Sequence, residues 1–332
     1  MKKTLIILLA VCMMVTLFAA CGGGGGSSAP AVPAADSSGG SEEAAPAGDR
    51  TFVIGALSKQ NADTFVQNIF DAMEARAAEL PEVTLLVQDA EGDINAQINQ
   101  AEAMITQQVD AIILNPVDVD GNAPIVTMAI DAGIPIILCN TLTNNSELAT
   151  AYVGSDDVDA GRIQAEFLKG VLADDANVTY MMGPIGVSPQ IYRKEGIERY
   201  LFDVTNMTVL AEQTANWKRD EALALAENWL TSFQDLDAII CQNDDMALGV
   251  LEAVEAAGRK DQIIVVGIDA ITDALTAVKA GRLDATVFQD AAGQGAGSVD
   301  AALKAAKEGV LKMPDVMIPF VLVTQANVDD FM

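Results

Sequence analysis

Apolar runs alternate with segments of helical periodicity from about residue 51 to the end of the chain. Runs such as residues 52–57, 111–114 and 238–241 have no alternating polar positions, which is typical of strands covered on both faces. Between the first two runs, residues 64–80 place apolar side chains at helical spacing. This alternation predicts βαβ units, in which helices connect neighbouring strands of a parallel sheet.

The same alternation starts again after residue 154 and ends with a predicted helix at 299–307 and a predicted strand at 318–323. The whole pattern contains more strands than one open sheet usually holds. We therefore predict the α/β class, with two doubly wound parallel-sheet lobes of ordinary domain size.

Residues 1–20 have the features of an export signal. Two lysines precede an apolar run at residues 5–17 that is too short for a usual membrane span, and Ala19 and Ala20 stand directly before Cys21. This junction resembles the lipobox of bacterial lipoproteins, which implies that cleavage leaves the cysteine as the lipid-bearing first residue. An ordinary signal peptide and an uncleaved anchor are the alternatives. Residues 21–50 are rich in Gly, Ser, Ala and Pro, and we expect them to form a disordered tether.

The composition excludes several functions. The 332-residue chain has 47 acidic and 19 basic residues and a net charge of −28, so we expect no binding to nucleic acid, and no stable adsorption to a membrane except through the lipid anchor. It has no histidine, the commonest general base and metal ligand. Cys139 and Cys241 are interpreted as buried thiols, with a disulfide between them as the alternative.

Polar residues follow the apolar runs. Ligands of doubly wound sheets bind beyond the carboxyl ends of the strands, so these residues are candidates for binding. Most are amides, carboxylates and hydroxyls, which form paired hydrogen bonds with polyols. The set comprises residues 58–63, Asn115, Asn140, 183–189, Asn243, Asp269 and Gln289. Each has a structural alternative: Asn140 and Asp269 as turn residues or helix caps, and Asn243 as the N-cap of a helix.

Five segments carry a resemblance to a known family. They are Asp110-Ala-Ile-Ile-Leu-Asn-Pro116, Gly133-Ile-Pro-Ile-Ile137, Val153-Gly-Ser-Asp156, Gln242-Asn-Asp-Asp-Met-Ala-Leu-Gly249 and Val265-Val-Gly-Ile-Asp-Ala270. In this order they resemble the periplasmic monosaccharide-binding proteins of the ribose and galactose type. The galactose/glucose branch is most similar locally, at residues 215–218 and 285–290. The resemblance implies the type 1 periplasmic binding fold and a monomeric, extracytoplasmic substrate-binding protein that delivers a sugar to the permease of an ABC transporter.

The resemblance also implies a pocket in which two aromatic side chains, one from each lobe, hold a sugar ring while polar groups bind its hydroxyls. Residues at matching positions are Asp63, Phe65 and Asn140 in the first lobe, Arg193, Trp217, Asn243 and Asp269 in the second, and Gln289 at a hinge. Core packing is the alternative for Phe65 and Trp217, although the polar neighbours of Trp217 favour the pocket.

Chains of this family cross between their lobes three times. Here the crossings are predicted near residues 153–155, 288–291 and 320–322. The first lobe then comprises residues 51–153 and 290–320, and the second comprises 154–289 and 321–332.

Two positions differ from the galactose/glucose branch. Val187 and Pro189 stand where that branch has a His and an Asp that bind distal hydroxyls. The change makes one wall less polar, which predicts a pentose, a deoxy sugar or another small polyol as ligand. The calcium-binding loop of that branch is missing at residues 172–176, and residues 118–121 lack the EF-hand spacing. We therefore predict neither a metal nor a cofactor.

Three other classes of protein share parts of this pattern. Gly293-Gln-Gly-Ala-Gly297 lacks the full glycine spacing of a dinucleotide-binding loop and is better interpreted as a tight helix entry. With no histidine to support a nucleophile, we predict that the chain is not an enzyme. Sugar-responsive repressors share the core, but they carry a basic helix-turn-helix where this chain has its signal and tether. A receptor for a furanosyl signalling molecule or a nucleoside stays the alternative.

The lipobox resemblance predicts that Cys21→Ser prevents lipid attachment, because the thiol that would carry the lipid is removed. The variant is expected to be shed, or retained with its signal uncleaved. Mass spectrometry of the wild-type protein is the direct measurement, and cleavage elsewhere with an unmodified Cys21 would contradict the prediction.

Overall fold

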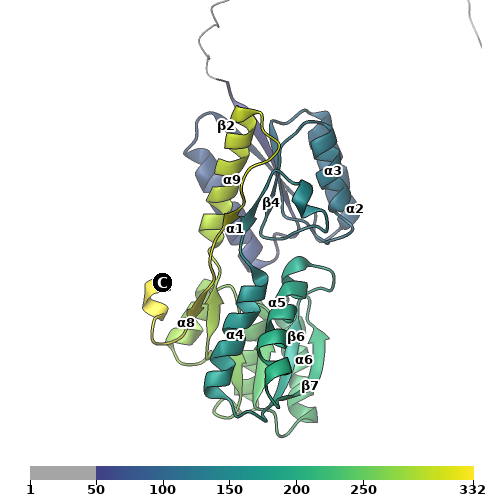
Figure 1. Ribbon diagram of the computed structural model, residues 1–332. Coiled ribbons are helices and arrows are strands. Elements are labelled where there is room, and N and C mark those ends of the chain that lie inside the picture. The colour runs from purple at the N-terminus through teal and green to yellow at the C-terminus, as the bar shows by residue number, and fades with distance from the viewer. Residues whose placement is uncertain (1–49) are drawn as a thin grey trace, which may run out of the picture. The chain divides into compact units, whose positions relative to one another are not determined.

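The structure, a computed structural model, describes residues 50–332. The predicted signal, the predicted tether and Cys21 lie outside these residues. The described residues form two α/β lobes, each built on a parallel sheet (Figure 1). The fold class predicted from the alternation of apolar runs and helical segments is therefore confirmed. In this part of the chain, no helix has the length and apolar character needed to cross a membrane.

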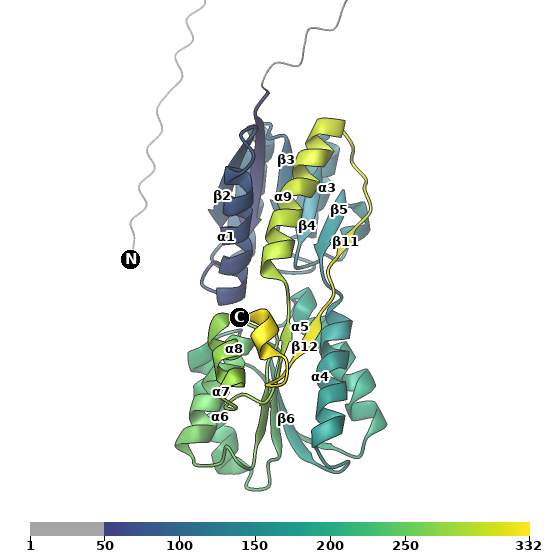
Figure 2. The ribbon, with the colours of Figure 1, turned by 90° about the vertical axis from the view of Figure 1, so that its left-hand side faces the viewer.

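The first lobe is built on six parallel strands in the order β11-β5-β4-β3-β1-β2. The strands are β1 (Phe52–Ser58), β2 (Val83–Asp89), β3 (Ala111–Leu114), β4 (Ile136–Cys139), β5 (Ala151–Gly154) and β11 (Val316–Met317). Helices α1 (Thr64–Ala78) and α9 (Ala291–Glu308) pack together on one face, and α2 (Ile94–Thr106) and α3 (Ala123–Asp131) cover the other (Figures 1 and 2). A short 3₁₀ helix, η1 (Ser146–Leu148), follows β4. Because both faces are covered, every residue of β3, β4 and β5 is buried.

The second lobe has a four-stranded parallel sheet in the order β7-β6-β8-β9, and an antiparallel pair, β10–β12, continues it. The strands are β6 (Asn177–Met182), β7 (Thr208–Thr214), β8 (Ala238–Cys241), β9 (Ile264–Val266), β10 (Thr286–Phe288) and β12 (Val321–Val323). The helices are α4 (Asp157–Val171), α5 (Ser188–Tyr200), α6 (Arg219–Ser232), α7 (Asp244–Ala256) and α8 (Thr272–Lys279), with 3₁₀ helices η2 (Phe202–Val204) and η3 (Val328–Phe331). Single bridges, Val266 to Ala285 and Asp269 to Phe288, join the pair to the parallel sheet.

The chain passes between the two sheets after β5, after β10 and after β11 (Figure 2). The last passage corrects the single strand predicted at residues 318–323. Met317 ends β11 beside Gly154 of the first lobe, whereas Val321 begins β12 in the second. Pro319 lies between them and has no N–H to donate to a ladder, so the apolar run is divided at this residue.

Helix α9 begins at Ala291, eight residues before the predicted start at residue 299. Asp290 caps it by accepting a hydrogen bond from the Gly293 N–H at 2.8 Å. The glycines of residues 293–297 lie in its first turns, where they allow a close approach to α1. A Cβ on Gly295 would lie 2.3 Å from the carbonyl oxygen of Ile69.

Cys139 and Cys241 end the central strands β4 and β8, one in each lobe. Both thiols are free and fully buried, as predicted from their position at the end of apolar runs. Burial raises the pKa of the Cys139 thiol to about 12, so it stays protonated and unreactive at neutral pH.

The α1–α9 contact predicts that Gly295→Ala destabilises the fold by about 1–3 kcal/mol, because the added methyl group forces two helix backbones apart. Gly170→Ala is the matched control, since Gly170 lies in α4 with nothing within 4 Å of the added atom. The control should be neutral or stabilise by up to about 1 kcal/mol. Urea unfolding measures both values, and equal effects would contradict the close contact.

Candidate ligand-binding cleft

Seven of the eight side chains predicted to bind a ligand line one cavity between the lobes. The cavity encloses about 260 Å³ of empty space. Its lining residues are Lys59, Asp63, Phe65, Val66, Asn140, Pro189, Arg193, Trp217, Asn243 and Asp269. A side chamber continues from it past Val117 and Val187, and shares Lys59, Asp63 and Trp217. The eighth predicted residue, Gln289, is buried behind the cavity and contacts Arg193.

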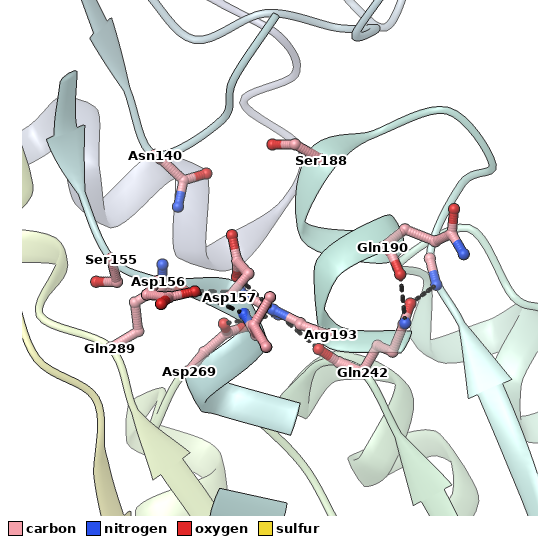
Figure 3. Close-up of polar contacts among 12 residues, drawn as sticks. Asn140, Ser155, Asp156, Asp157, Ser188, Gln190, Arg193, Gln242, Asp269 and Gln289 are labelled. Carbon is pink, nitrogen blue, oxygen red and sulfur yellow. Dashed lines mark hydrogen bonds and ion pairs between the residues drawn. The ribbon is translucent and has the colours of Figure 1, made fainter. Parts of the chain in front are cut away.

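The guanidinium of Arg193 is held at the base of the cavity by residues from three parts of the second lobe (Figure 3). Its Nε donates to Asp157 Oδ1 at 2.9 Å, Nη1 to the carbonyl oxygen of Gln242 at 2.6 Å, and Nη2 to Gln289 Oε1 at 3.0 Å. Asp269 Oδ1 lies 3.7 Å from Nη1. A guanidinium has five N–H donors, so these three hydrogen bonds fix its orientation and leave donors for a ligand.

The two aromatic residues approach the cavity from opposite lobes. Phe65 lies in the first turn of α1 and is also part of the hydrophobic core, so both interpretations of this residue hold. Trp217 precedes α6 and is half-buried, and its ring packs so closely on Gly183 that a Cβ there would lie 2.0 Å from the ring. The Arg193 guanidinium carbon lies 5.8 Å from the centre of the Trp217 ring, within cation–π range.

Three of the lining residues have strained backbones. Asn140, Trp217 and Asp269 have φ angles of 64°, 63° and 126°, in a region that residues with a side chain rarely adopt. Each such conformation costs about 1–3 kcal/mol. Neither Asn140 nor Asp269 caps a helix, so the structural alternative for these two residues is wrong. Their strain is concentrated where their side chains meet the cavity, which is typical of a binding site.

Two lining residues also cap helices. Asp63 Oδ1 accepts hydrogen bonds from the N–H groups of Phe65 and Val66, at 3.0 and 3.2 Å. Asn243 Oδ1 accepts from the Met246 N–H at 3.0 Å. The capping interpretation of Asn243 is therefore correct, and it is compatible with binding, because capping occupies one oxygen and leaves the other polar atom of each side chain available.

Sequence reasoning did not single out two charged residues of the site. Lys59 directly follows β1, inside the polar segment that the sequence pointed to, and it lines both the cavity and the side chamber. Asp157 is the buried partner of Arg193; it resembles an ordinary acid in the first turn of a helix, so its sequence carried no signal. Burial lowers the pKa of the Lys59 amine, and Asp63 partly opposes the shift. Burial also raises the pKa of Asp269 well above its ordinary value, although Arg193 opposes that shift.

The lobes touch directly beside the cavity. The Val119 N–H donates to the carbonyl oxygen of Gly186 at 2.9 Å, and the Leu142 N–H donates to Ser188 Oγ at 2.8 Å. Val119 and Leu142 belong to loops of the first lobe, whereas Gly186 and Ser188 lie at the start of α5 in the second. The structure therefore has a closed cleft.

A larger crevice lies beside the start of α4, lined by Tyr152, Tyr192 and Lys312 among others. It contains none of the predicted binding residues. Its acidic residue Asp315 accepts a hydrogen bond from the Tyr152 N–H at 2.8 Å, and Asp157 is paired with Arg193. The convergence of charged, amide and aromatic groups therefore favours the smaller cavity as the binding site.

Comparisons with known proteins agree with this geometry. The family model described as "Periplasmic binding protein domain" matches residues 54–309. An ABC transporter solute-binding protein of Bacillus halodurans, solved with bound myo-inositol, is similar with a TM-score of 0.82 and 42% identity, over 85% of this chain and 98% of that one. A protein of Rhizobium meliloti to which rhizopine binding is ascribed is 38% identical over 84% of this chain and 92% of its own. The xylitol-binding protein of Mycolicibacterium smegmatis is 38% identical over 74% of this chain and 70% of its own.

The buried ion pair predicts that Asp157→Ala destabilises the protein by about 3–5 kcal/mol, because Arg193 loses its closest carboxylate in a desolvated position. Glu255→Ala is the matched control, since Glu255 pairs with the exposed Arg282 at 2.7 Å. That change should cost about 1 kcal/mol or less. Urea denaturation compares the two, and similar losses would show that the Arg193 pair is not critical.

Proposed function

The chain belongs to the periplasmic binding protein family, and we propose that it encloses a neutral cyclitol or monosaccharide in the cleft between its lobes. It is a solute-binding protein of a sugar or polyol ABC transporter, and its family is not enzymatic. The observation that carries the proposed ligand class is the convergence of two aromatic side chains with carboxylate, amide and cationic groups on one small cavity. Aromatic faces suit the C–H surface of a sugar ring, and the polar groups suit its hydroxyls.

Two observations support a compact polyol. The cavity, at about 260 Å³, is smaller than a typical site for a drug-sized ligand. Val187 and Val117 make the adjoining side chamber less polar, so hydroxyls that extend there would lose hydrogen bonds. Relatives at 42% and 38% identity are described with myo-inositol and xylitol, both compact polyols. The local likeness to the galactose/glucose branch stays a prediction.

Binding proceeds by closure of the cleft. The ligand enters an open form in which the Val119–Gly186 and Leu142–Ser188 hydrogen bonds are broken, and it then contacts both lobes as these bonds form. Closure is favoured because the second set of contacts exists only in the closed form. The three connections act as the hinge, with residues 51–153 and 290–320 moving against 154–289 and 321–332. The permease then recognises the closed form.

The protein works outside the cytoplasm, held to the membrane by a lipid on Cys21. Support for this anchor comes from the Ala19-Ala20-Cys21 junction and the Gly/Ser-rich segment that follows it. The anchor keeps the binding lobes close to the permease, whereas the acidic chain gives them no attraction of their own to anionic lipid.

The proposed function predicts that the full-length protein is stabilised by myo-inositol, xylitol or a pentose. A ligand at about 100 times its dissociation constant adds about 2.7 kcal/mol of stability. Thermal unfolding with and without each compound measures the effect. In the bound protein, Trp217→Ala should weaken binding about tenfold or more, because the ring that covers the ligand is lost. Absence of any shift across polyols, with a shift for a nucleoside, would favour the alternative receptor.

The second tryptophan gives a matched control for this test. Trp229 lies in α6 and is buried in the core of the second lobe, away from the cavity. Trp229→Ala should lower stability by about 3–5 kcal/mol and leave the ligand affinity of the folded fraction unchanged. If Trp217→Ala instead lowered stability as much and left affinity unchanged, Trp217 would be a core residue.

A further inference from the structure

Lys59 is a buried cation that the fold leaves without a partner. It follows β1, is 8% exposed, and its side chain reaches both the cavity and the side chamber. Among residues 50–332, no acceptor lies within hydrogen-bond distance of its Nζ and no carboxylate lies within 4.0 Å. Buried charges in proteins are nearly always paired and hydrogen-bonded. Lys59 therefore requires acceptors that come from outside the chain.

The other charges of the cavity are already engaged. Arg193 pairs with Asp157 at 2.9 Å and lies 3.7 Å from Asp269. Asp63 uses Oδ1 to cap α1, and its Oδ2 has no partner among the described residues. Lys59 and Asp63 thus stand side by side in the first lobe, one as an unsatisfied donor and the other as an unsatisfied acceptor.

We propose that Lys59 and Asp63 together bind ligand hydroxyls and select a neutral ligand over one that carries an ammonium group. This inference rests on the proposed function and assigns the charge class of its ligand. A hydroxyl group can accept a hydrogen bond from Lys59 and donate one to Asp63. An ammonium in the same place has donors only, so it would serve Asp63, leave Lys59 unsatisfied and place two cations together in a poorly solvated cavity.

The opposite charge is disfavoured by the same pair. A ligand carboxylate could accept from Lys59, but it would lie against the unpaired oxygen of Asp63 and close to Asp269. Removing either member of the pair should therefore shift the charge preference in a defined direction. Loss of Lys59 should make the site more tolerant of cations, and loss of the Asp63 charge should make it less tolerant.

The probes are myo-inositol and a monoamino-deoxyinositol, which differ by one hydroxyl and one positive charge. Their affinities for the full-length protein are measured by titration calorimetry at neutral pH. The wild-type protein should bind myo-inositol at least about tenfold more tightly than the amine. In Lys59→Met, which keeps the length of the side chain, this ratio should fall by about tenfold, and binding of myo-inositol should weaken because a hydrogen bond is lost.

Two further variants separate charge from hydrogen bonding. Lys59→Gln keeps a donor without the charge, so it should relax the ratio while retaining more affinity for myo-inositol than Lys59→Met; it also replaces that variant if Lys59→Met fails to fold. Asp63→Asn preserves the helix cap, because Asn is an equally good capping residue, and should raise the ratio. Lys304→Met, on the exposed face of α9, is the control for net charge and should change nothing.

The outcomes distinguish this inference from the proposed function. If the wild-type protein binds myo-inositol but binds the amine equally well, or if neither Lys59 variant changes the ratio, the charge selection is wrong and the proposed function stands. If the wild-type protein binds no neutral polyol at all, the proposed function fails and this inference fails with it.

Discussion

The pairing of the buried Arg193 is the constraint on which the cleft depends. A desolvated guanidinium is tolerated only when its donors have partners, and Asp157, Gln242 and Gln289 supply them. Asp157 follows the first passage between the lobes, and Gln289 lies at the second. Because these partners must stay in place, the hinge ends of α4 and β10 remain fixed to the second lobe. The binding surface of that lobe is therefore preformed, and closure consists of the first lobe approaching it.

Glycine packing gives this arrangement its accuracy. Helices α4 and α5 carry Asp157 and Arg193, and they touch backbone to backbone at Gly161, where a Cβ would lie 2.3 Å from the carbonyl oxygen of Arg193. So short a distance between the helices fixes their relative register. The separation of the ion pair thus follows from a small residue one turn away, and a side chain at Gly161 would disturb the cleft without touching the ligand.

Local patterns were sufficient to predict most of the fold and insufficient for part of the site. The runs at β3 and β8 have the predicted bounds, because a strand buried on both faces is apolar along its whole length. The start of α9 was missed because glycines are poor helix formers, and only the packing against α1 explains them. Residues such as Trp217 were placed by resemblance, and the structure brings them to the cavity. Lys59 and Asp157 were missed because their importance lies in burial and pairing between distant segments, which no local pattern encodes.

The closed cleft leaves several buried donors unsatisfied, and this links closure to binding. Trp217 Nε1 and Gln289 Nε2 have no hydrogen-bond partner among residues 50–332, and the Lys59 amine is in the same position. Each unsatisfied buried group costs about 1–3 kcal/mol relative to its hydrated state. The strained backbones of Asn140, Trp217 and Asp269 add to this cost. An open cleft would let water reach these groups, so closure without a ligand is opposed by their desolvation. A polyol with several hydroxyls supplies the missing partners together, and for this reason the closed form is stable chiefly when the cleft is occupied. The same unsatisfied groups that disfavour empty closure thus allow a permease to distinguish the loaded protein from the empty one.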